Sequence, residues 1–386
     1  MTRIAVIADS HYDEHSRFEE CLRIHQWIAR DLVERGVDLV LHAGDVFERK
    51  STPRERMAFA SWVRQVTDHA PLLIVRGNHD AVGDLPLFAR LETKHPVIVE
   101  EGAAVHVVAG VAVGCLAWPR RAEILAAAGH EGREATEQLA GDALRAVLRG
   151  LGQELANQEG PRILLSHAMV RGSVTSTGQP LVGCDLEIGL DDLALAGADF
   201  VALGHIHKGQ QWDPGGVPMA YPGSPRRTSF GELESKAYLV VDLFPGRRGE
   251  IAVERVETPS TPMVHVDAEV RELGGSLLLV AEDAPDDVRG AEVRLRYLVD
   301  ADQRELGKRL AAERKEALLR DGAVDVRVEE VVRPTTRARA PEVAKATTLE
   351  GKLRSFWAAK NDVPPAPRDA ELIRKAIHLD DTTEAA

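Results

Sequence analysis

Five short clusters of polar residues carry side chains that could hold metal ions. Each cluster follows a run of apolar residues, and the five are Asp9-Ser10-His11, Gly44-Asp45, Gly77-Asn78-His79-Asp80, Ser166-His167 and Gly204-His205-Ile206-His207. Together they offer carboxylates, imidazoles and one amide, but no thiolate. This mixture suits a borderline-hard divalent ion such as manganese(II), with iron(II) or magnesium as alternatives. So many ligands predict a site for two divalent metal ions acting on one substrate.

Each cluster also has an ordinary explanation. Asp9 followed by His11 is by itself more typical of a helix N-cap than of a ligand, and Gly44-Asp45 alone is a common turn. Gly-Asn-His-Asp and Gly-His-x-His are more informative, because buried imidazoles and amides need partners. Five such clusters in order make coincidence the minority interpretation. The nine other histidines are predicted to be structural or on the surface: His15, His25, His42, His69, His95, His106, His130, His265 and His378.

The elements that must position these clusters alternate between short apolar runs and amphipathic stretches. Strands are predicted at Ile4–Ala8, Asp38–His42, Pro71–Val75, Arg162–Leu165, Asp199–Leu203, Pro218–Tyr221, Ala237–Leu243 and Ile251–Val256. Helices are predicted at Phe18–Arg35, from Pro53 onward and within Ala122–Asn157. No helix separates Val97–Val99, Val105–Val108 and Val111–Ala117, so these are predicted to form an antiparallel run. The alternation predicts an α/β fold, in which ligands bind beyond the carboxyl ends of the strands.

The rest of the chain is predicted to form two further parts. Pro259 and Pro262 mark a boundary, which gives a first domain at 1–260. A β-β-α-β set fills residues 261–333, with strands at Met263–Val270, Ala291–Val299 and Val324–Val332 and a helix at Asp302–Asp321. A basic linker, Arg333–Pro341, leads to residues 340–386, where short helices are predicted at Thr348–Lys360 and Asp369–Leu379, followed by a frayed acidic tail, Asp380–Ala386.

Composition narrows the cellular setting and the class of ligand. No apolar run approaches the ~20 residues that cross a bilayer, so no membrane partner is expected. The three cysteines, Cys21, Cys115 and Cys184, are scattered and predict buried free thiols in a reducing, cytoplasmic compartment. The net charge of −13 is unfavourable for a nucleic-acid-binding protein, so any contact with DNA would use local basic patches. Lys208 and the pair Arg226 and Arg227 are the preferred candidates, with solvated surface charge as the alternative.

The ordered motifs D-x-H, G-D, G-N-H-D, a lone H and G-H-x-H resemble those of the calcineurin-like metallophosphoesterase superfamily. More narrowly, Gly44-Asp45-Val46-Phe47, Tyr221-Pro222-Gly223-Ser224-Pro225 and Phe230-Gly231-Glu232 with Lys236 resemble the SbcD family of DNA double-strand-break-repair nucleases. The resemblance covers residues 1–260 and implies a four-layer αββα sandwich with a small α+β capping domain and a C-terminal helical tail.

The resemblance also implies roles for individual residues. One metal ion would be held by Asp9, His11, Asp45 and His207, and the other by Asp45, Asn78, His167 and His205. Asp45 would then bridge the two ions. His79 matches the catalytic histidine of the family, and Asp80 would orient its ring, with a turn cap as the alternative role for Asp80. One departure stands next to this set, because Glu48 occupies a position where archaeal and eukaryotic relatives have a histidine.

The function implied is a manganese-dependent DNA exonuclease subunit, with endonuclease activity left open. It would act at DNA ends, as a homodimer, with an SbcC-like coiled-coil ATPase docked on residues 340–386. Two alternatives remain. One is a small-molecule or cyclic-nucleotide phosphodiesterase with the same metals, and the other is a non-enzymatic scaffold that has kept the fold. Hydrolysis of linear DNA against cyclic nucleotide separates the first, and metal content separates the second.

Overall fold

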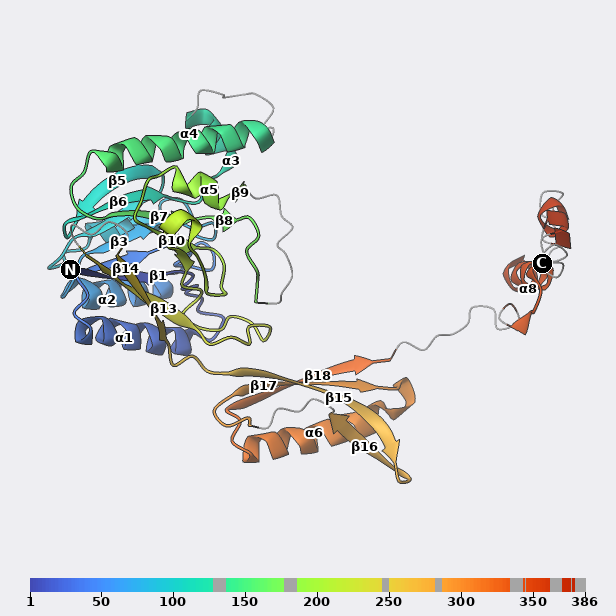
Figure 1. Cartoon of the computed structure of the whole chain (residues 1–386). Helices are drawn as coiled ribbons and strands as arrows, with labels where there is room; N and C mark the ends of the chain where they lie inside the picture. The colour runs from blue at the N-terminus through green and yellow to red at the C-terminus, as the bar shows by residue number, and fades with distance from the viewer. Residues whose placement is uncertain are drawn as a thin grey trace. The chain divides into compact units, whose positions relative to one another are not determined.

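The computed structural model describes residues 1–127, 137–176, 186–244, 250–281, 287–333, 343, 345–361, 370–375 and 377–378 (Figure 1). Two compact units are present. One comprises Met1–Val266, Asp283–Leu295 and Lys315–Val328, and the other comprises Asp267–Glu282, Arg296–Arg314 and Glu329–Ala386. Several predicted features lie outside the described residues: Cys184, most of the basic linker, part of the predicted helical stretch Ala122–Asn157, and the acidic tail. Within the described parts, none of the helices combines the length and the apolar character needed to cross a membrane.

The first unit contains two six-stranded sheets, of which the first carries the N-terminus. Its strand order is β14-β13-β1-β2-β3-β4. The strands are β1 (Thr2–Ile7), β2 (Leu39–His42), β3 (Leu72–Val75), β4 (Val97–Glu100), β13 (Ala237–Leu243) and β14 (Ile251–Glu257). β1 to β4 are parallel, as crossover helices allow, whereas β13 runs antiparallel to β1.

Two helices connect the first three strands of this sheet. They are α1 (Phe18–Glu34) and α2 (Pro53–Thr67). α2 begins where the sequence predicts, because Pro53 fits the first helical turn and Thr52 forms a capping box with Glu55. The apolar faces of both helices pack on the sheet through residues such as Ile24, Ile28 and Phe59, all of them buried.

The second sheet has the order β11-β12-β10-β7-β6-β5. Its strands are β5 (Ala103–Val108), β6 (Val111–Leu116), β7 (Arg162–His167), β10 (Phe200–Gly204), β11 (Gln210–Trp212) and β12 (Met219–Tyr221). Three helices accompany it, namely α3 (Arg121–Ala127), α4 (Glu137–Ala156) and α5 (Leu190–Ala194), and a two-stranded sheet pairs β8 (Met169–Val170) with β9 (Glu187–Ile188).

Three hydrophobic clusters define the layers. One lies between the first sheet and helices α1 and α2, and a second packs α4 and α5 on the second sheet. The third joins the two sheets face to face, with Val6 and Leu41 from one and Val113 and Leu165 from the other. Figure 1 shows the same succession, with α4 above the sheets and α1 below them. The predicted αββα sandwich is therefore confirmed.

One sequence prediction about the sheets is wrong. The sequence predicts β4 in an antiparallel run with β5 and β6, but β4 pairs in parallel with β3, with Leu72 opposite Val97. The chain between β3 and β4 contains a 3-10 helix, Leu85–Arg90, which returns it to the same end of the first sheet. Only β5 and β6 form the expected antiparallel hairpin, through a tight turn at Ala109 and Gly110, both with positive φ.

The following strands form a four-stranded sheet of order β16-β15-β17-β18. Its elements are β15 (Met263–Leu273), β16 (Ser276–Ala281), β17 (Glu292–Val299), α6 (Arg304–Arg320) and β18 (Asp325–Val332). The sequence prediction lacks β16. Gly274 and Gly275, with φ of 59° and 80°, form the two-residue turn of a β15–β16 hairpin. In the C-terminal region, α8 spans Leu349–Asn361.

Candidate metal centre

The polar clusters lie at the carboxyl ends of five parallel strands from both sheets of the sandwich. Asp9 and His11 follow β1, Asp45 follows β2, and Asn78 follows β3. His167 is the last residue of β7, and His205 follows β10, two positions before His207. Because β1 to β3 belong to one sheet and β7 and β10 to the other, the candidate site lies where the edges of the two sheets meet.

Several residues of the site adopt an unusual backbone conformation. Asp9, His11, Asp45 and His205 have φ of 54°, 46°, 54° and 116°. Positive φ is uncommon for residues other than glycine, and such strained positions cluster at functional sites. Local hydrogen bonds support the conformation, since the Asp9 nitrogen donates to the Gly44 carbonyl and the His11 nitrogen to the Asp45 carbonyl. The loops after β1 and β2 therefore brace each other.

Glycine at two positions permits the close approach of these loops. A Cβ atom at Gly77 would lie 2.1 Å from Oδ1 of Asp45, and one at Gly204 would lie 2.0 Å from the Ala43 carbonyl. Any side chain at these positions would displace the loop that carries Asp45. This explains why glycine precedes the polar residues in both clusters.

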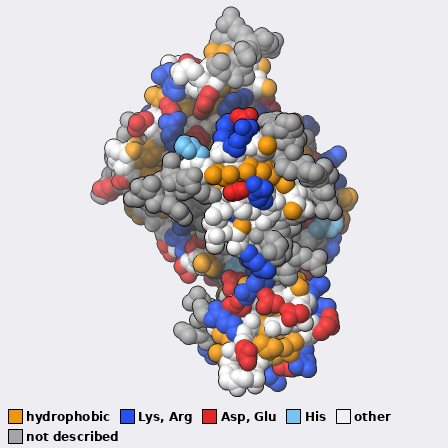
Figure 2. Space-filling model, turned by 90° about the vertical axis from the view of Figure 1, so that its right-hand side faces the viewer, with side chains coloured by type: hydrophobic (Ala, Val, Ile, Leu, Met, Phe, Trp, Pro, Cys, Tyr) orange, Lys and Arg blue, Asp and Glu red, His pale blue; other side chains and the backbone are white. Residues whose placement is uncertain are grey.

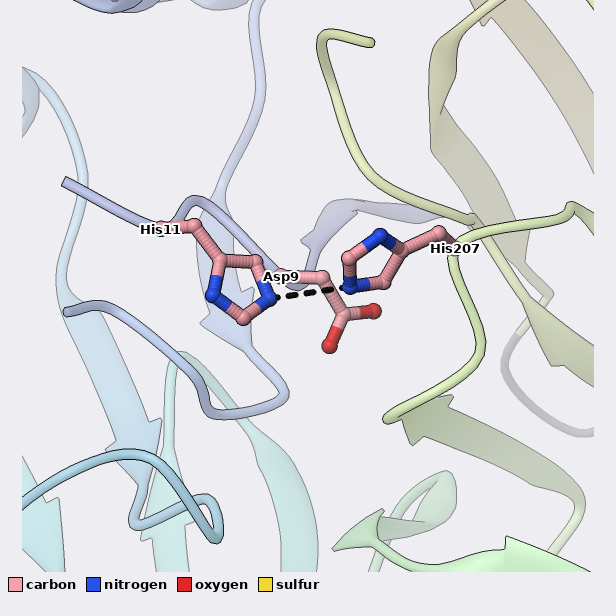
Figure 3. A group of neighbouring side chains, drawn as sticks. All are labelled: Asp9, His11 and His207. Carbon is pink, nitrogen blue, oxygen red and sulfur yellow. Dashed lines mark hydrogen bonds between the residues drawn. The ribbon is translucent and has the colours of Figure 1, made fainter. Parts of the chain in front are cut away.

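The first candidate group consists of Asp9, His11 and His207 (Figure 3). One ligand atom from each residue lies within 4.8 Å of the others. The Nε2 atoms of His11 and His207 face each other at 2.9 Å, an arrangement that needs a shared proton or a cation. Oδ2 of Asp9 is buried and has no hydrogen-bond partner. A buried, unpaired carboxylate oxygen is costly without a counter-charge, so the group fits a cation.

The second candidate group consists of Asp45, His167 and His205, with ligand atoms again within 4.8 Å of one another. Oδ1 of Asn78 lies 2.8 Å from Nε2 of His167 and 3.0 Å from Nδ1 of His205. The amide oxygen thus points to the same place as both imidazoles. All four residues that the resemblance assigns to one metal ion are brought together.

Asp45 lies between the two groups. Its Oδ2 atom is 3.8 Å from Nε2 of His11 and 3.4 Å from Nε2 of His167. Burial would raise the pKa of the Asp45 carboxyl, but the charge and hydrogen bond of His167, followed by the charge of His11, hold that pKa well below its usual range. A carboxylate in this position can contact two cations at once.

The protonation of the neighbouring groups also bears on metal binding. Burial lowers the pKa of His205 to about 3 and lowers the pKa of His11, so both rings are neutral, as metal ligands must be. Burial raises the pKa of Asp9, an effect that the charge of a bound cation would oppose. The donor set of carboxylates, imidazoles and an amide therefore fits two divalent ions.

His79 lies beside the first group and is partly exposed. Its ring centroid is 5.0 Å from that of His11. Nδ1 of His79 is 2.7 Å from the Glu48 carbonyl, to which it donates, so Nε2 is the nitrogen left for a substrate. The His79 backbone nitrogen donates to Oδ1 of Asp45 at 2.9 Å. The same loop therefore holds both the predicted catalytic histidine and the central aspartate.

The predicted role of Asp80 needs correction. Its carboxylate does not contact the His79 ring but accepts hydrogen bonds from the backbone nitrogens of Phe47, at 3.0 Å, and Gly77, at 2.9 Å. Asp80 is buried, and burial raises the pKa of its carboxyl to about 6. It acts as a loop cap, because two backbone donors needed an acceptor there.

The preferred DNA contacts, Arg226 and Arg227, also need correction. Arg226 is only 1% exposed and donates to the carbonyl of His11, while Arg227 donates to the carbonyls of Glu232 and Glu234. Both guanidinium groups therefore hold loops of the protein and cannot reach a DNA backbone from these positions. Lys208 is half-buried, and nothing in the structure tests its predicted contact.

Three residues near the site have no role in the sequence analysis. Glu48 places its carboxylate 2.8 Å from Nδ1 of His11. Glu232 lies 3.5 Å from Nδ1 of His207. The Trp118 ring packs on His205, with centroids 4.8 Å apart. Trp118 follows the end of β6 and so shares the carboxyl edge of the sheet, which is the signal that could have revealed it.

Comparison with known proteins agrees with this site. The model of the calcineurin-like phosphoesterase family matches residues 2–209, which is more than half of the chain. The chain therefore belongs to the calcineurin-like phosphoesterase family, and it is a metal-dependent phosphoesterase, an enzyme of the hydrolase class. The predicted recognition of the superfamily is confirmed.

Among characterised proteins, the chain is similar to two kinds of DNA repair nuclease. It is 27% identical to the SbcD component of the nuclease SbcCD of Bacillus subtilis, over 63% of this chain and 67% of that protein. It is 25% identical to the DNA double-strand break repair protein Mre11 of Halobacterium salinarum, over 74% of this chain and 69% of that protein. It is also 27% identical to the SbcD component of the nuclease SbcCD of Escherichia coli, over 71% and 73%.

Proposed function

We propose that this chain is the manganese-dependent exonuclease subunit of an SbcCD-like DNA repair complex. The observation that carries the proposal is the position of Asp45 between two groups of imidazole and carboxylate ligands, with His79 at their edge. The similarity to SbcD and Mre11 supports DNA as the substrate. Whether endonuclease activity accompanies the exonuclease is left open.

In this proposal, the first group holds one ion together with Asp45, and Asn78, His167 and His205 hold the other together with Asp45. Two such ions polarise a bound phosphodiester and lower the pKa of water, which makes a nucleophile available near neutral pH. The ligand set contains nitrogen and oxygen donors but no sulfur, which suits manganese(II), with iron(II) or magnesium as alternatives.

The chain's own residues supply the remaining chemistry. Nδ1 of His79 is held by the Glu48 carbonyl, so Nε2 can face the phosphate or the leaving oxygen. A protonated His79 can stabilise charge on the transferred phosphoryl group or donate a proton to the departing alkoxide. Trp118 covers His205 and His167, with centroid distances of 4.8 and 5.6 Å, and so helps to exclude bulk water from that side.

Contact with DNA would use isolated cations and not one basic field. In the view of Figure 2, Lys and Arg side chains are scattered among Asp and Glu side chains. Lys208 directly follows His207 and is the retained candidate for a phosphate contact. A partner protein would supply the rest of the electrostatic attraction, since the chain itself carries a net charge of −13.

The proposed partner is a coiled-coil ATPase that docks on residues 340–386, and the proposed assembly contains a homodimer of this chain in the cytoplasm. α8 exposes Leu349 and Phe356 by 40% and 46%, and beyond it Leu372 and Ile377 are exposed by 44% and 37%. Apolar side chains on one face of a helix commonly dock in a partner's groove. The change Phe356→Glu should abolish co-purification with the ATPase, whereas Leu233→Glu, at a 73% exposed site elsewhere, should not. Retained co-purification of Phe356→Glu and of a truncation after Ala340 would contradict the docking site.

The decisive assay compares two substrates. End-labelled linear duplex DNA and a cyclic nucleotide are each incubated with the full chain in manganese(II), with and without a chelator. The proposal predicts degradation of the DNA, no hydrolysis of the cyclic nucleotide, and loss of activity in Asp45→Asn. Hydrolysis of the cyclic nucleotide alone would assign a small-molecule phosphodiesterase, and absence of bound metal would assign a scaffold.

A further inference from the structure

Two glutamates flank the Asp9, His11 and His207 group from opposite sides. Oε2 of Glu48 lies 2.8 Å from Nδ1 of His11. On the other side, Oε1 of Glu232 lies 3.5 Å from Nδ1 of His207, and Oγ1 of Thr228 lies 3.2 Å from the same nitrogen. Thr228 donates its proton to Glu232 at 2.5 Å, so its oxygen is free to accept from His207. Each imidazole therefore has an acceptor behind it.

These contacts determine which nitrogen of each ring can bind a cation. When Nδ1 donates to an acceptor, the neutral ring carries its lone pair on Nε2. The Nε2 atoms of His11 and His207 are the atoms that face each other at 2.9 Å, next to Asp9 (Figure 3). Both imidazoles are thus set in the tautomer and orientation of metal ligands before any ion arrives.

Glu232 is itself held in a charged state inside the protein. It is 3% exposed, and Nζ of Lys236, which is 2% exposed, lies 2.5 Å from its Oε2 atom. Lys236 also donates to the His207 carbonyl at 3.0 Å. The lysine therefore fixes both ends of the contact between Glu232 and His207. Glu48 differs because its side chain is 39% exposed.

The second group lacks such carboxylates. Nδ1 of His167 donates to the carbonyl of Ala43 at 2.7 Å, which is a neutral acceptor. Asn78 contributes a neutral amide, and His205 packs on the apolar Trp118 ring. A carboxylate behind a histidine makes the imidazole a stronger donor than a carbonyl does, and such outer partners contribute about 10–100-fold to metal affinity. The two halves of the centre therefore differ in charge and in donor strength.

We propose that Glu48 and Glu232 are positioning residues that make the Asp9, His11 and His207 group the primary cation site, which fills first and binds more tightly. The Asp45, His167 and His205 group then binds the second ion more weakly. The inference rests on the function proposed above, because it assumes that both groups bind metal ions. It assigns a role to Glu48, the position at which this chain departs from archaeal and eukaryotic relatives.

Calorimetric titration of metal-stripped full-length protein with manganese(II) chloride tests this order. Wild type should bind two ions in two steps of different affinity. Glu48→Gln and Glu232→Gln should each weaken the tighter step by about 10–100-fold and leave two ions bound. Asn78→Ala should remove or weaken only the second step. Glu254→Gln, a 58% exposed glutamate paired with Arg35, is the matched control and should change neither step.

Electron paramagnetic resonance adds a readout that a purely structural role would not change. With one equivalent of manganese(II), wild type should give the spectrum of one isolated ion, and Glu48→Gln should give a mixture of free and bound ions. Glu48→Asp, which keeps the carboxylate, should recover part of the affinity. Glu48→Gln alone suffices if Glu232→Gln fails to fold.

Specific results would overturn the inference. They are unchanged affinities in Glu48→Gln, equal weakening of both steps, loss of the tighter step in Asn78→Ala, or loss of one whole equivalent in Glu48→Gln, which would make Glu48 a ligand. Binding of two ions with any of these outcomes contradicts only the order of filling. Binding of no manganese by wild type contradicts the proposed function as well.

Discussion

The backbone nitrogen of His205 donates a hydrogen bond of 2.9 Å to Oδ1 of Asp9, although 196 positions separate the two residues. This bond joins the carboxyl end of β10 in one sheet to that of β1 in the other. It also occupies one oxygen of Asp9 and leaves Oδ2 buried without a partner. The contact that closes the sandwich therefore also leaves a carboxylate oxygen for a cation.

The first prediction concerns His79. Replacing His79 with alanine should lower kcat for DNA hydrolysis by about 10²–10⁴-fold, because a positioned proton donor contributes rate enhancements of that size. Manganese content should not change, since the described contacts of the His79 ring are with Glu48 and His11 and not with the second group. Metal analysis and single-turnover kinetics on the same preparation provide the measurement. Loss of metal together with activity would make His79 a ligand.

The second prediction separates Lys208 from Arg226. Lys208→Ala should reduce the slope of log K against log salt concentration for DNA binding by about 0.9, the value for one lost phosphate contact. Arg226→Ala should leave that slope unchanged and instead lower the melting temperature, because its guanidinium is buried against the His11 carbonyl. Fluorescence anisotropy over a salt series measures the slope. A smaller slope in Arg226→Ala at unchanged stability would make Arg226 a DNA contact after all.

The third prediction concerns a buried chain of hydrogen bonds. The Ser10 hydroxyl lies 2.8 Å from Nε2 of both His25 and His42, and Nδ1 of His25 donates to the Cys21 carbonyl. His25 can therefore only accept from Ser10, which in turn accepts from His42. Burial lowers the pKa of His25 to about 4 and that of His42 to about 3.

These low pKa values make stability depend on pH. Between the unfolded pKa of 6.5 and the folded value, the unfolded chain binds more protons. The stability that neutral His25 contributes is thus complete above pH 6.5 and is lost as the pH falls toward 4. In His25→Gln, the free energy of unfolding should fall less steeply in this range, by up to about 1.4 kcal/mol per pH unit. Urea unfolding in chelator at several pH values measures it, and parallel curves for the two proteins would contradict it.

The fourth prediction concerns the free thiols. Cys21 and Cys115 are both fully buried, and burial raises the pKa of Cys21 to about 11 and raises that of Cys115 further above its ordinary value. In a Cys184→Ser background, a thiol reagent at pH 8 should not label the native protein but should label two thiols after unfolding. Rapid labelling of the native protein would show that one of these thiols is accessible.

Much of the site could be predicted because strand ends carry local information. A polar residue directly after a buried strand, as at Asp9 and Asp45, must lie at the carboxyl edge of a parallel sheet, and such edges bring distant segments together. The roles of Arg226 and Asp80 could not be predicted in the same way. They depend on which backbone groups lie beside them in space, and the sequence around Arg226 gives no sign that the His11 carbonyl faces it.

The fold follows the same division. α2 could be located because Pro53 and the Thr52 capping box are local signals. The prediction places β4 in the wrong sheet because an apolar run such as Val97–Val99 fits either a parallel or an antiparallel neighbour. It misses β16, although Gly274-Gly275 is a hairpin signal, because this strand is a continuous apolar run without the alternation of a half-buried strand.

The central claim is that Asp45 lies between two cations, and anomalous diffraction from crystals grown in manganese(II) tests it most directly. The account predicts two peaks about 3.5–4 Å apart, on either side of the Asp45 carboxylate. One peak should lie among Asp9, His11 and His207, and the other among Asn78, His167 and His205. A single peak, or two peaks that do not share Asp45, would contradict the account.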